Sequence, residues 1–263
     1  MTVLTFKRPR HDADFPRTPL VLPRLRVDLT RLAAYERVCG FPTGEDALPL
    51  TYPHVLGFPL ALRLMSRRSF PLPLLGLVHT SIEITGYEPL PATGRSYELS
   101  VRVAGLAPHR RGTEAGLVTE LRADGKAVWE SRSTYLARHR TDRTDTQAAG
   151  PRRERPPAPL PVVAEWRLGG DVGRRYAAVS GDRNPIHLHP LTARPFGFRR
   201  AIAHGMWTAA RSLAAYGVPP AARVRAEFRA PVLLPGAVTY RAEPGRFELR
   251  GEDGRVHLTG TVS

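Results

Sequence analysis

The sequence predicts an α+β protein built from two related halves, each with a central helix wrapped by an antiparallel sheet. Three observations lead to this fold. In each half, segments of alternating apolar and polar residues follow a longer helical pattern. A proline-rich stretch without periodicity, residues 141–161, separates the halves and is expected to be a linker. Several short motifs recur in the same order on both sides of it.

The first half, residues 1–140, opens with a polar, proline-punctuated stretch that we expect to be an extended arm over residues 1–23. Helical spacing of apolar residues predicts a short helix over 31–39. Several prolines then break the chain before the apolar stretch 55–65, which contains the counterpart of the helix start in the second half. Strands are then expected over residues 78–84, 96–103, 117–121 and 127–135, with Asp124-Gly125 as the turn between the last two.

The second half, residues 162–263, contains the clearest helical pattern, Ala201–Tyr216, which Gly217 and two prolines bring to an end. A shorter helix is expected over Val172–Val179. The stretch Asp182–Phe198 contains three prolines and is expected to be irregular. Strands are expected over residues 166–168, 224–229, 238–242, 247–250 and 256–262, with a turn at Asp253-Gly254.

Three pairs of motifs indicate an internal duplication. They are Tyr35-x-x-Val38-x-Gly40 with Tyr176-x-x-Val179-x-Gly181, Leu56-Gly57-Phe58 with His204-Gly205-Met206, and the turn regions around Asp124 and Asp253. The halves differ where chemistry would take place, because Phe41 stands at the position of Asp182. We therefore expect the second half to carry the active site and the first half to be a degenerate copy.

The charge and the cysteine content of the chain exclude or disfavour several classes of function. The chain carries 39 Lys and Arg residues against 24 Asp and Glu, a formal net charge of +15, and Lys7 and Lys126 are its only lysines. The arginines are dispersed, which disfavours nucleic-acid binding and suggests a solvated surface that attracts acidic ligands. Cys39 is the only cysteine, which leaves no disulfide framework and no cysteine-based zinc site. No apolar stretch could span a bilayer or act as a signal sequence, so we expect a cytoplasmic protein without membrane contact.

The candidate chemistry lies between Ser180 and His187. Asp182 and His187 place a carboxylate and an imidazole five residues apart, with the Asn184-Pro185 bend between them. Such a pair can take a proton from one atom and give a proton to another. Asn184 could hold a side chain or a water in position. The pattern therefore suits a proton removal coupled to loss of a hydroxyl group.

Gly205 could supply the third requirement of such a reaction. Near the start of a helix its backbone N–H would point outward at the positive end of the helix dipole. Glycine has no side chain to block a ligand there. We expect this N–H to bind a carbonyl oxygen on which negative charge grows.

These residues resemble the hydratase-2 motif of the MaoC-like dehydratases. The matching residues are Tyr176, Ser180, Asp182, Asn184, Pro185 and His187, followed by Ala203-His204-Gly205-Met206. The duplicated layout is similar to the double-hotdog members of that family, and the resemblance covers essentially the whole chain. It implies reversible hydration of trans-2-enoyl thioesters to (R)-3-hydroxyacyl thioesters, the reaction of an (R)-specific enoyl-CoA hydratase or 3-hydroxyacyl-thioester dehydratase.

The resemblance also implies roles for individual residues. Asp182 and His187 would activate the water, and the Gly205 N–H would bind the thioester carbonyl. Tyr176, Ser180 and His204 would support the site, although Tyr176 stands where an aromatic residue of the Phe type is common. No metal and no redox cofactor would be needed. The substrate would be a thioester of CoA or of an acyl carrier protein, and two chains could associate as a homodimer.

Other interpretations remain open at the level of sequence. Asp182 could be only a turn residue, since Gly-Asp-x-Asn-Pro favours turns. His187, His189 and His204 could instead bind a metal ion. A hotdog thioesterase would use the same scaffold but usually a lone carboxylate, and a non-catalytic module could bind acyl thioesters without reaction.

Four prolines, at positions 42, 49, 53 and 59, lie around the central helix of the first half. A proline inside a helix removes a hydrogen bond and clashes with the preceding turn. We therefore expect a broken helix there. The resemblance to the double-hotdog members of the family implies that such a gap would leave room for a longer or bulkier acyl chain.

Overall fold

The computed structural model describes residues 9–141 and 160–263. The helices and strands before the undescribed segment are β1 (Leu20–Leu25), α1 (Leu29–Cys39), α2 (Tyr52–Met65), β2 (Leu77–Gly86), β3 (Tyr97–His109), β4 (Gly112–Ala123) and β5 (Lys126–Arg138). The predicted strands are therefore correct in position, and several are longer than expected.

The second half follows the same plan with additional short elements. It contains β6 (Val162–Leu168), α3 (Val172–Ser180), α4 (Pro185–Leu188), α5 (Pro190–Ala193), the 3-10 helix η1 (Arg194–Phe196), β7 (Ala201–Ile202), α6 (Gly205–Tyr216), β8 (Arg223–Phe228), β9 (Leu233–Leu234), β10 (Gly236–Glu243), β11 (Arg246–Gly251) and β12 (Val256–Val262).

The strand order reveals the duplication. Ten strands form one antiparallel sheet in the order β1-β3-β4-β5-β2-β8-β12-β11-β10-β6. Counted outward from the centre, the corresponding strands of the two halves occupy the same positions on opposite sides. β2 and β8 join the halves, with Ile82 opposite Ala226. This arrangement confirms the predicted α+β double hotdog.

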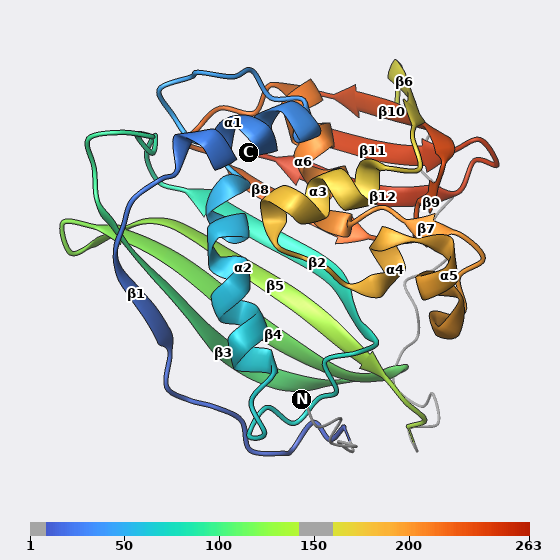
Figure 1. The fold of residues 1–263 in the computed structure, drawn as a ribbon, viewed down its shortest axis with the longest axis horizontal. Coiled ribbons are helices and arrows are strands. Elements are labelled where there is room, and N and C mark those ends of the chain that lie inside the picture. Colours follow the sequence, from blue (N-terminus) through green and yellow to red (C-terminus); the bar gives the residue numbers. More distant parts are fainter. Residues whose placement is uncertain (1–8, 142–159) are drawn as a thin grey trace.

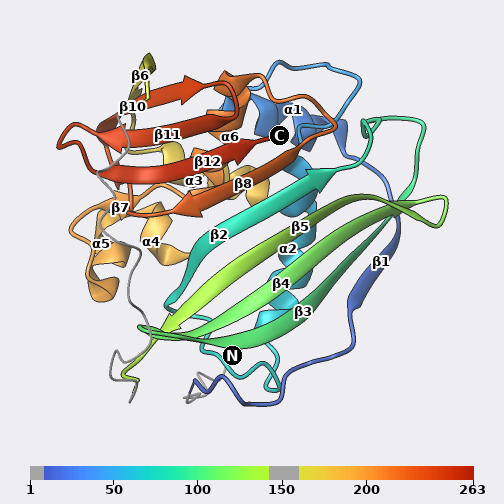
Figure 2. The same ribbon diagram turned by 180° about the vertical axis from the view of Figure 1, so that it is seen from behind.

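The helices gather on one face of the sheet. In Figure 1, α1, α2, α3 and α6 lie in front of the strands, and Figure 2 shows the other face of the sheet without helices over it. α1 and α3 lie side by side where the halves meet, with the rings of Tyr35 and Tyr176 6.2 Å apart. Both tyrosines are buried, so their packing fixes the relative position of the two helices.

Proline explains where the sequence-based expectations are wrong. The expected break in the first central helix is absent, because α2 runs unbroken for 14 residues with Pro53 at its N-terminal end and Pro59 inside. Pro185 and Pro190 each begin a helix of four residues, and Pro195 lies in the first turn of η1. The N–H that proline lacks has no helical partner at this position in any case, so proline starts a helix as well as it ends one.

Two further boundaries differ from expectation. The helix predicted from Ala201 begins at Gly205, because Ala201 and Ile202 pair with β9 in an extended conformation. The arm predicted over residues 1–23 ends in a strand, since β1 pairs with β3 at the sheet edge. Apart from residues 141, 160 and 161, the expected linker lies outside the described residues. No helix in the described part of the chain is long and apolar enough to cross a bilayer.

Candidate active site

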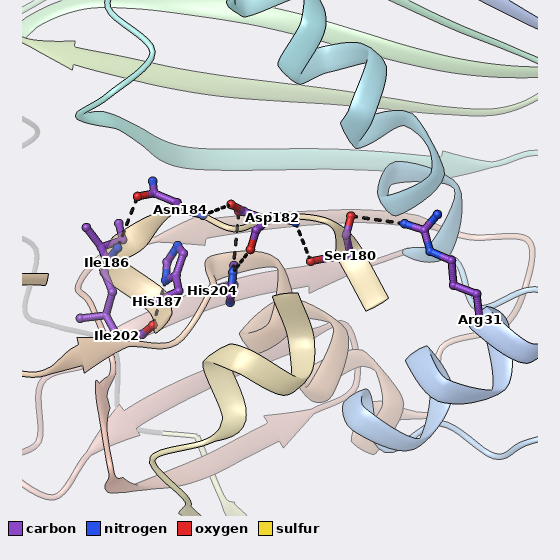
Figure 3. A network of polar contacts seen from close by, with 8 residues as sticks. All are labelled: Arg31, Ser180, Asp182, Asn184, Ile186, His187, Ile202 and His204. Atoms are coloured by element: carbon purple, nitrogen blue, oxygen red, sulfur yellow. Dashed lines mark hydrogen bonds and ion pairs between the residues drawn. The ribbon is translucent and has the colours of Figure 1, made fainter. Parts of the chain in front are cut away.

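Asp182 lies in a tight turn after α3. The helix ends at Gly181, whose φ of 81° is in the left-handed region that favours glycine. The Asp182 N–H donates to Ser180 Oγ at 3.2 Å, and the Asn184 N–H donates to Asp182 Oδ1 at 3.1 Å. The Asp182 side chain remains 28% exposed. The turn thus fixes the carboxylate while leaving part of it accessible to a ligand (Figure 3).

His187 lies on α4 and has a defined tautomer. Its Nδ1 is 2.8 Å from the carbonyl oxygen of Ile202, which can only accept, so Nδ1 carries the hydrogen. In the neutral ring Nε2 then carries a lone pair. The Asn184 side chain caps α4 by accepting a hydrogen bond from the Ile186 N–H at 3.4 Å. The bend between Asp182 and His187 therefore orients a ring that can accept a proton through Nε2 (Figure 3).

His204 connects the two catalytic candidates. Its Nε2 donates to the backbone carbonyl of Asp182 at 3.0 Å and lies 3.9 Å from Asp182 Oδ2. Its ring stacks on His187 with centroids 3.7 Å apart, and Tyr176 packs against its ring at 4.9 Å. His204 Nδ1 is buried and has no hydrogen-bond partner among the described residues. His204 is thus a buried neighbour of both Asp182 and His187.

Burial determines the charge states of the group. It raises the pKa of Asp182, against the opposing effects of His187 and the Asn184 N–H. It lowers the pKa of His187, while the Asp182 carboxylate acts in the opposite direction. The pKa of His204 lies well below its usual range because of burial and the nearby His187. Both imidazoles are therefore neutral near pH 7.

Gly205 is the first residue of α6. No side chain caps this helix end, and Gly205 keeps some exposure while its neighbours His204 and Met206 are buried. A Cβ built on Gly205 would come within 3.0 Å of the ring of Phe228. A side chain here would thus require the Phe228 ring to shift by a few tenths of an ångström. Without one, the helix end can present a backbone N–H to an anionic oxygen.

The structure brings together all seven residues singled out from the sequence. Asp182, His187 and His204 form the centre, and Gly205 directly follows His204. Ser180 and Asn184 bond the Asp182 turn, and Tyr176 contacts His204. The Asn184 carbonyl is used as a helix cap, so a role in substrate binding remains a prediction. His189 is outside the group, because its Nδ1 accepts from the Leu191 N–H.

The first half has no equivalent carboxylate. Phe41 stands at that position and stacks on Tyr35 at 6.2 Å. The first half instead contributes residues that no motif identified. Arg31 bonds the end of α3, and the ring of His79 lies 4.8 Å from Phe228. Long-range contacts of this kind leave no local pattern in a sequence.

Asp182, His187 and His204 also form a cluster whose ligand atoms lie within 4.8 Å of one another. A metal ion about 2 Å from both rings would need lone pairs that converge on one point. The His187 and His204 rings are stacked, with only 27° between their planes, so their in-plane lone pairs do not converge. The arrangement does not fit a metal site.

The fold and the site together define a double-hotdog protein with acid/base groups beside a helix N-terminus. The family described as MaoC like domain matches residues 151–257. A curated relative, 3-hydroxyacyl-thioester dehydratase X of Mycobacterium tuberculosis, is 38% identical over 97% of this chain and 91% of its own length. The chain therefore belongs to the MaoC-like 3-hydroxyacyl-thioester dehydratases, which are hydro-lyases.

Solved structures agree with this family. The crystal structure of HtdX of Mycobacterium tuberculosis matches with a TM-score of 0.80 and 35% identity, over 93% of this chain and 99% of that one. A MaoC-like dehydratase from Phytophthora capsici has the same fold, with a TM-score of 0.75 over 96% of this chain and 97% of its own, at 18% identity.

Proposed function

We propose that Asp182 and His187 hydrate a trans-2-enoyl thioester to the (R)-3-hydroxyacyl thioester and catalyse the reverse dehydration. The single observation that carries this assignment is the fixed tautomer of His187. Because Nδ1 donates to Ile202, the lone pair of the neutral ring is at Nε2. The ring also lies close enough to the partly exposed Asp182 carboxylate for the carboxylate to affect its pKa. A base and a carboxylate in this position can hold one water between them.

In the hydration direction, the water oxygen forms a bond to carbon three of the enoyl group as the carbon–carbon double bond opens. Asp182 and His187 withdraw a proton from the water, and one proton is delivered to carbon two. Atoms and charge therefore balance without an oxidant, a reductant or a metal. Dehydration reverses these steps, with a proton leaving carbon two and the hydroxyl leaving carbon three as water.

Negative charge grows on the thioester oxygen while carbon two lacks its proton. The N-terminus of α6 at Gly205 offers a backbone N–H and the positive end of a helix dipole to that oxygen. The partial exposure of Gly205 gives the thioester a route to this N–H. We assign the oxyanion-binding role to Gly205 on this basis.

The substrate is an acyl thioester of CoA or of an acyl carrier protein. Both carry phosphate groups, which suit the excess of arginine in the chain. The name of the Mycobacterium tuberculosis relative specifies 3-hydroxyacyl thioesters without choosing between the two carriers. A cytoplasmic location and a homodimer remain predictions from the sequence.

The assay uses purified protein with crotonyl-CoA and longer enoyl-CoAs, and follows the conjugated enoyl absorbance and free thiol in parallel. Loss of absorbance without thiol release is the expected result. Thiol release would indicate a thioesterase instead, and no change in either signal with any substrate would indicate a module that only binds. A parallel reaction after treatment with a chelator tests the expectation that no metal is needed, and its rate should equal that of untreated protein.

A further inference from the structure

We propose that Arg31, from the degenerate first half, is a positioning residue for the Asp182 turn of the second half. Its Nε donates to the Val179 carbonyl at 2.8 Å, and its Nη2 donates to the Ser180 carbonyl at 3.4 Å. The two contacts join the halves of the protein, since Val179 lies 148 positions and Ser180 lies 149 positions after Arg31 in the chain. Figure 3 shows the Arg31 side chain reaching the end of α3 directly before Asp182.

The two carbonyls need such a partner. The last carbonyl groups of a helix have no intrahelical N–H to accept from. In α3 the Gly181 N–H bonds back to Ala177, which leaves Val179 and Ser180 to be satisfied from outside the helix. The planar guanidinium of Arg31 can donate to both at once, in a fixed geometry that an ammonium group cannot reproduce.

Arg31 is itself held in place. It lies in the first turn of α1, where the Asp28 carboxylate accepts from the Thr30 N–H at 2.9 Å and from the Arg31 N–H at 3.1 Å. Its side chain is partly buried between the halves. Arg31 thus ties the end of α3 to a capped helix start. The last residue of α3, Ser180, also carries the Oγ that bonds the Asp182 N–H, and Asp182 follows two residues later.

The pseudosymmetry of the fold makes the assignment specific to this half. Val38 corresponds to Val179, and its carbonyl also accepts from a side chain of the other half, Trp207 Nε1 at 2.8 Å. The position that corresponds to Arg31 is Val172 when Tyr35 is aligned with Tyr176. The half that has lost the carboxylate therefore carries the arginine, and the half that has the carboxylate lacks it.

The inference rests on the proposed function, because it assigns the purpose of the contact to the reaction at Asp182. Without Arg31, two carbonyls at the end of α3 lose their donor and the Asp182 turn gains freedom. A displacement of about 1 Å at a reacting group can reduce the rate about a hundredfold. Substrate contacts at Gly205 are on another element and are unaffected. The effect should therefore appear in kcat and much less in KM.

The test compares Arg31→Met and Arg31→Lys with Arg37→Met, which removes an exposed arginine from the same helix. We expect Arg31→Met to lower kcat for crotonyl-CoA hydration by about 10- to 100-fold with KM within about threefold. Added guanidinium ion should restore part of the kcat of Arg31→Met and should leave Arg37→Met unchanged. Arg31→Lys should be intermediate, since one ammonium can reach one carbonyl but not both.

Several results would overturn the proposal. One is a kcat of Arg31→Met within twofold of the wild type. Another is a variant in which KM rises and kcat does not change. A third is a folded Arg31→Met whose kcat guanidinium does not restore. If Arg31→Met does not fold, Arg31→Lys decides, and a wild-type kcat in that variant would reject the need for a two-pronged donor.

A measurement independent of activity separates this inference from the proposed function. The His204 Nε2–H that donates to the Asp182 carbonyl can be followed by nitrogen-15 NMR of the imidazole. We expect this signal to exchange faster with water in Arg31→Met than in the wild type and in Arg37→Met. Unchanged exchange would overturn the positioning role. An inactive wild type with the expected change in exchange would refute only the proposed reaction.

Discussion

The imidazole ring of His204 stacks on that of His187 with centroids 3.7 Å apart, and each ring donates one hydrogen to a backbone carbonyl. The His187 hydrogen goes to Ile202 and the His204 hydrogen goes to Asp182. The two bonds fix both tautomers and direct the lone pair of His187 to Nε2. His204 therefore supports the base by its ring and the carboxylate turn by its N–H.

This arrangement predicts that the hydrogen bond donated by His204 contributes more to kcat than the stacking of its ring does. His204→Gln keeps an N–H near the position of Nε2, whereas His204→Phe keeps the stacking and removes the donor. We expect kcat to fall about tenfold further in His204→Phe than in His204→Gln, as for the loss of a hydrogen bond to a buried group. Steady-state kinetics with crotonyl-CoA measures both. Equal rates would contradict a donor role for His204.

Gly205 should not tolerate a methyl group. The Cβ of Gly205→Ala would lie 3.0 Å from the Phe228 ring, on the residue whose N–H is proposed to bind the thioester oxygen. We expect kcat/KM to fall by about 10- to 100-fold, because the carbonyl would be displaced from the N–H. The double variant Gly205→Ala with Phe228→Leu relieves the contact and should recover part of the loss. No recovery would mean that the ring is not the cause.

Stability should fall in acid because of buried histidines in the first half. Burial lowers the pKa of His54 from 6.5 to about 4 and that of His79 to about 3. The unfolded chain takes up a proton near pH 6.5, whereas folded His54 takes it up only near pH 4, so protons favour unfolding between these values. Protonation of His54 alone then lowers the free energy of unfolding by ~3 kcal/mol as the pH falls through this window.

Denaturant titrations of the wild type and His54→Gln across this pH range measure the effect. The variant should show a shallower dependence of the unfolding free energy on pH, with the remainder due to His79. His11→Gln replaces an exposed histidine and serves as the control. An equal slope in wild type and His54→Gln would refute the burial of a neutral His54.

The His187 ring should report on Asp182. The Asp182 carboxylate acts to raise the pKa of His187 against the effect of burial. Asp182→Asn removes that charge, so the pKa of His187 should be lower in the variant than in the wild type. NMR titration of the imidazole signals measures this, with the His11 signal of the same sample as the reference. An unchanged pKa would show that the two groups do not interact, and a higher pKa would contradict the direction of the effect assigned to the carboxylate.

The sequence allowed the fold and the centre of the site to be predicted because both leave local patterns. Period-two alternation marked the strands, and the motif around Asp182 placed seven residues that the structure brings together. Asp124-Gly125 and Asp253-Gly254 form the expected turns. These features depend on neighbours in the chain, which is the information that a single sequence carries.

What could not be predicted depends on contacts across the fold. Arg31 had no motif, because its partners lie 148 and 149 positions away. The prolines were misjudged because the same residue breaks a helix interior and begins a helix, and only the flanking structure decides between these. Pro59 remains inside α2, since the packing of that helix against the sheet outweighs one lost hydrogen bond.

The most direct test of the account is the rate of crotonyl-CoA hydration by Asp182→Asn relative to the wild type, with His189→Gln as a control outside the site. Asn184 and the turn remain, so the variant removes the carboxylate charge and little else. We expect kcat/KM to fall by about 10²- to 10⁴-fold, the contribution of a positioned acid/base group. A value within threefold of the wild type in folded Asp182→Asn would contradict catalysis by the Asp182–His187 pair.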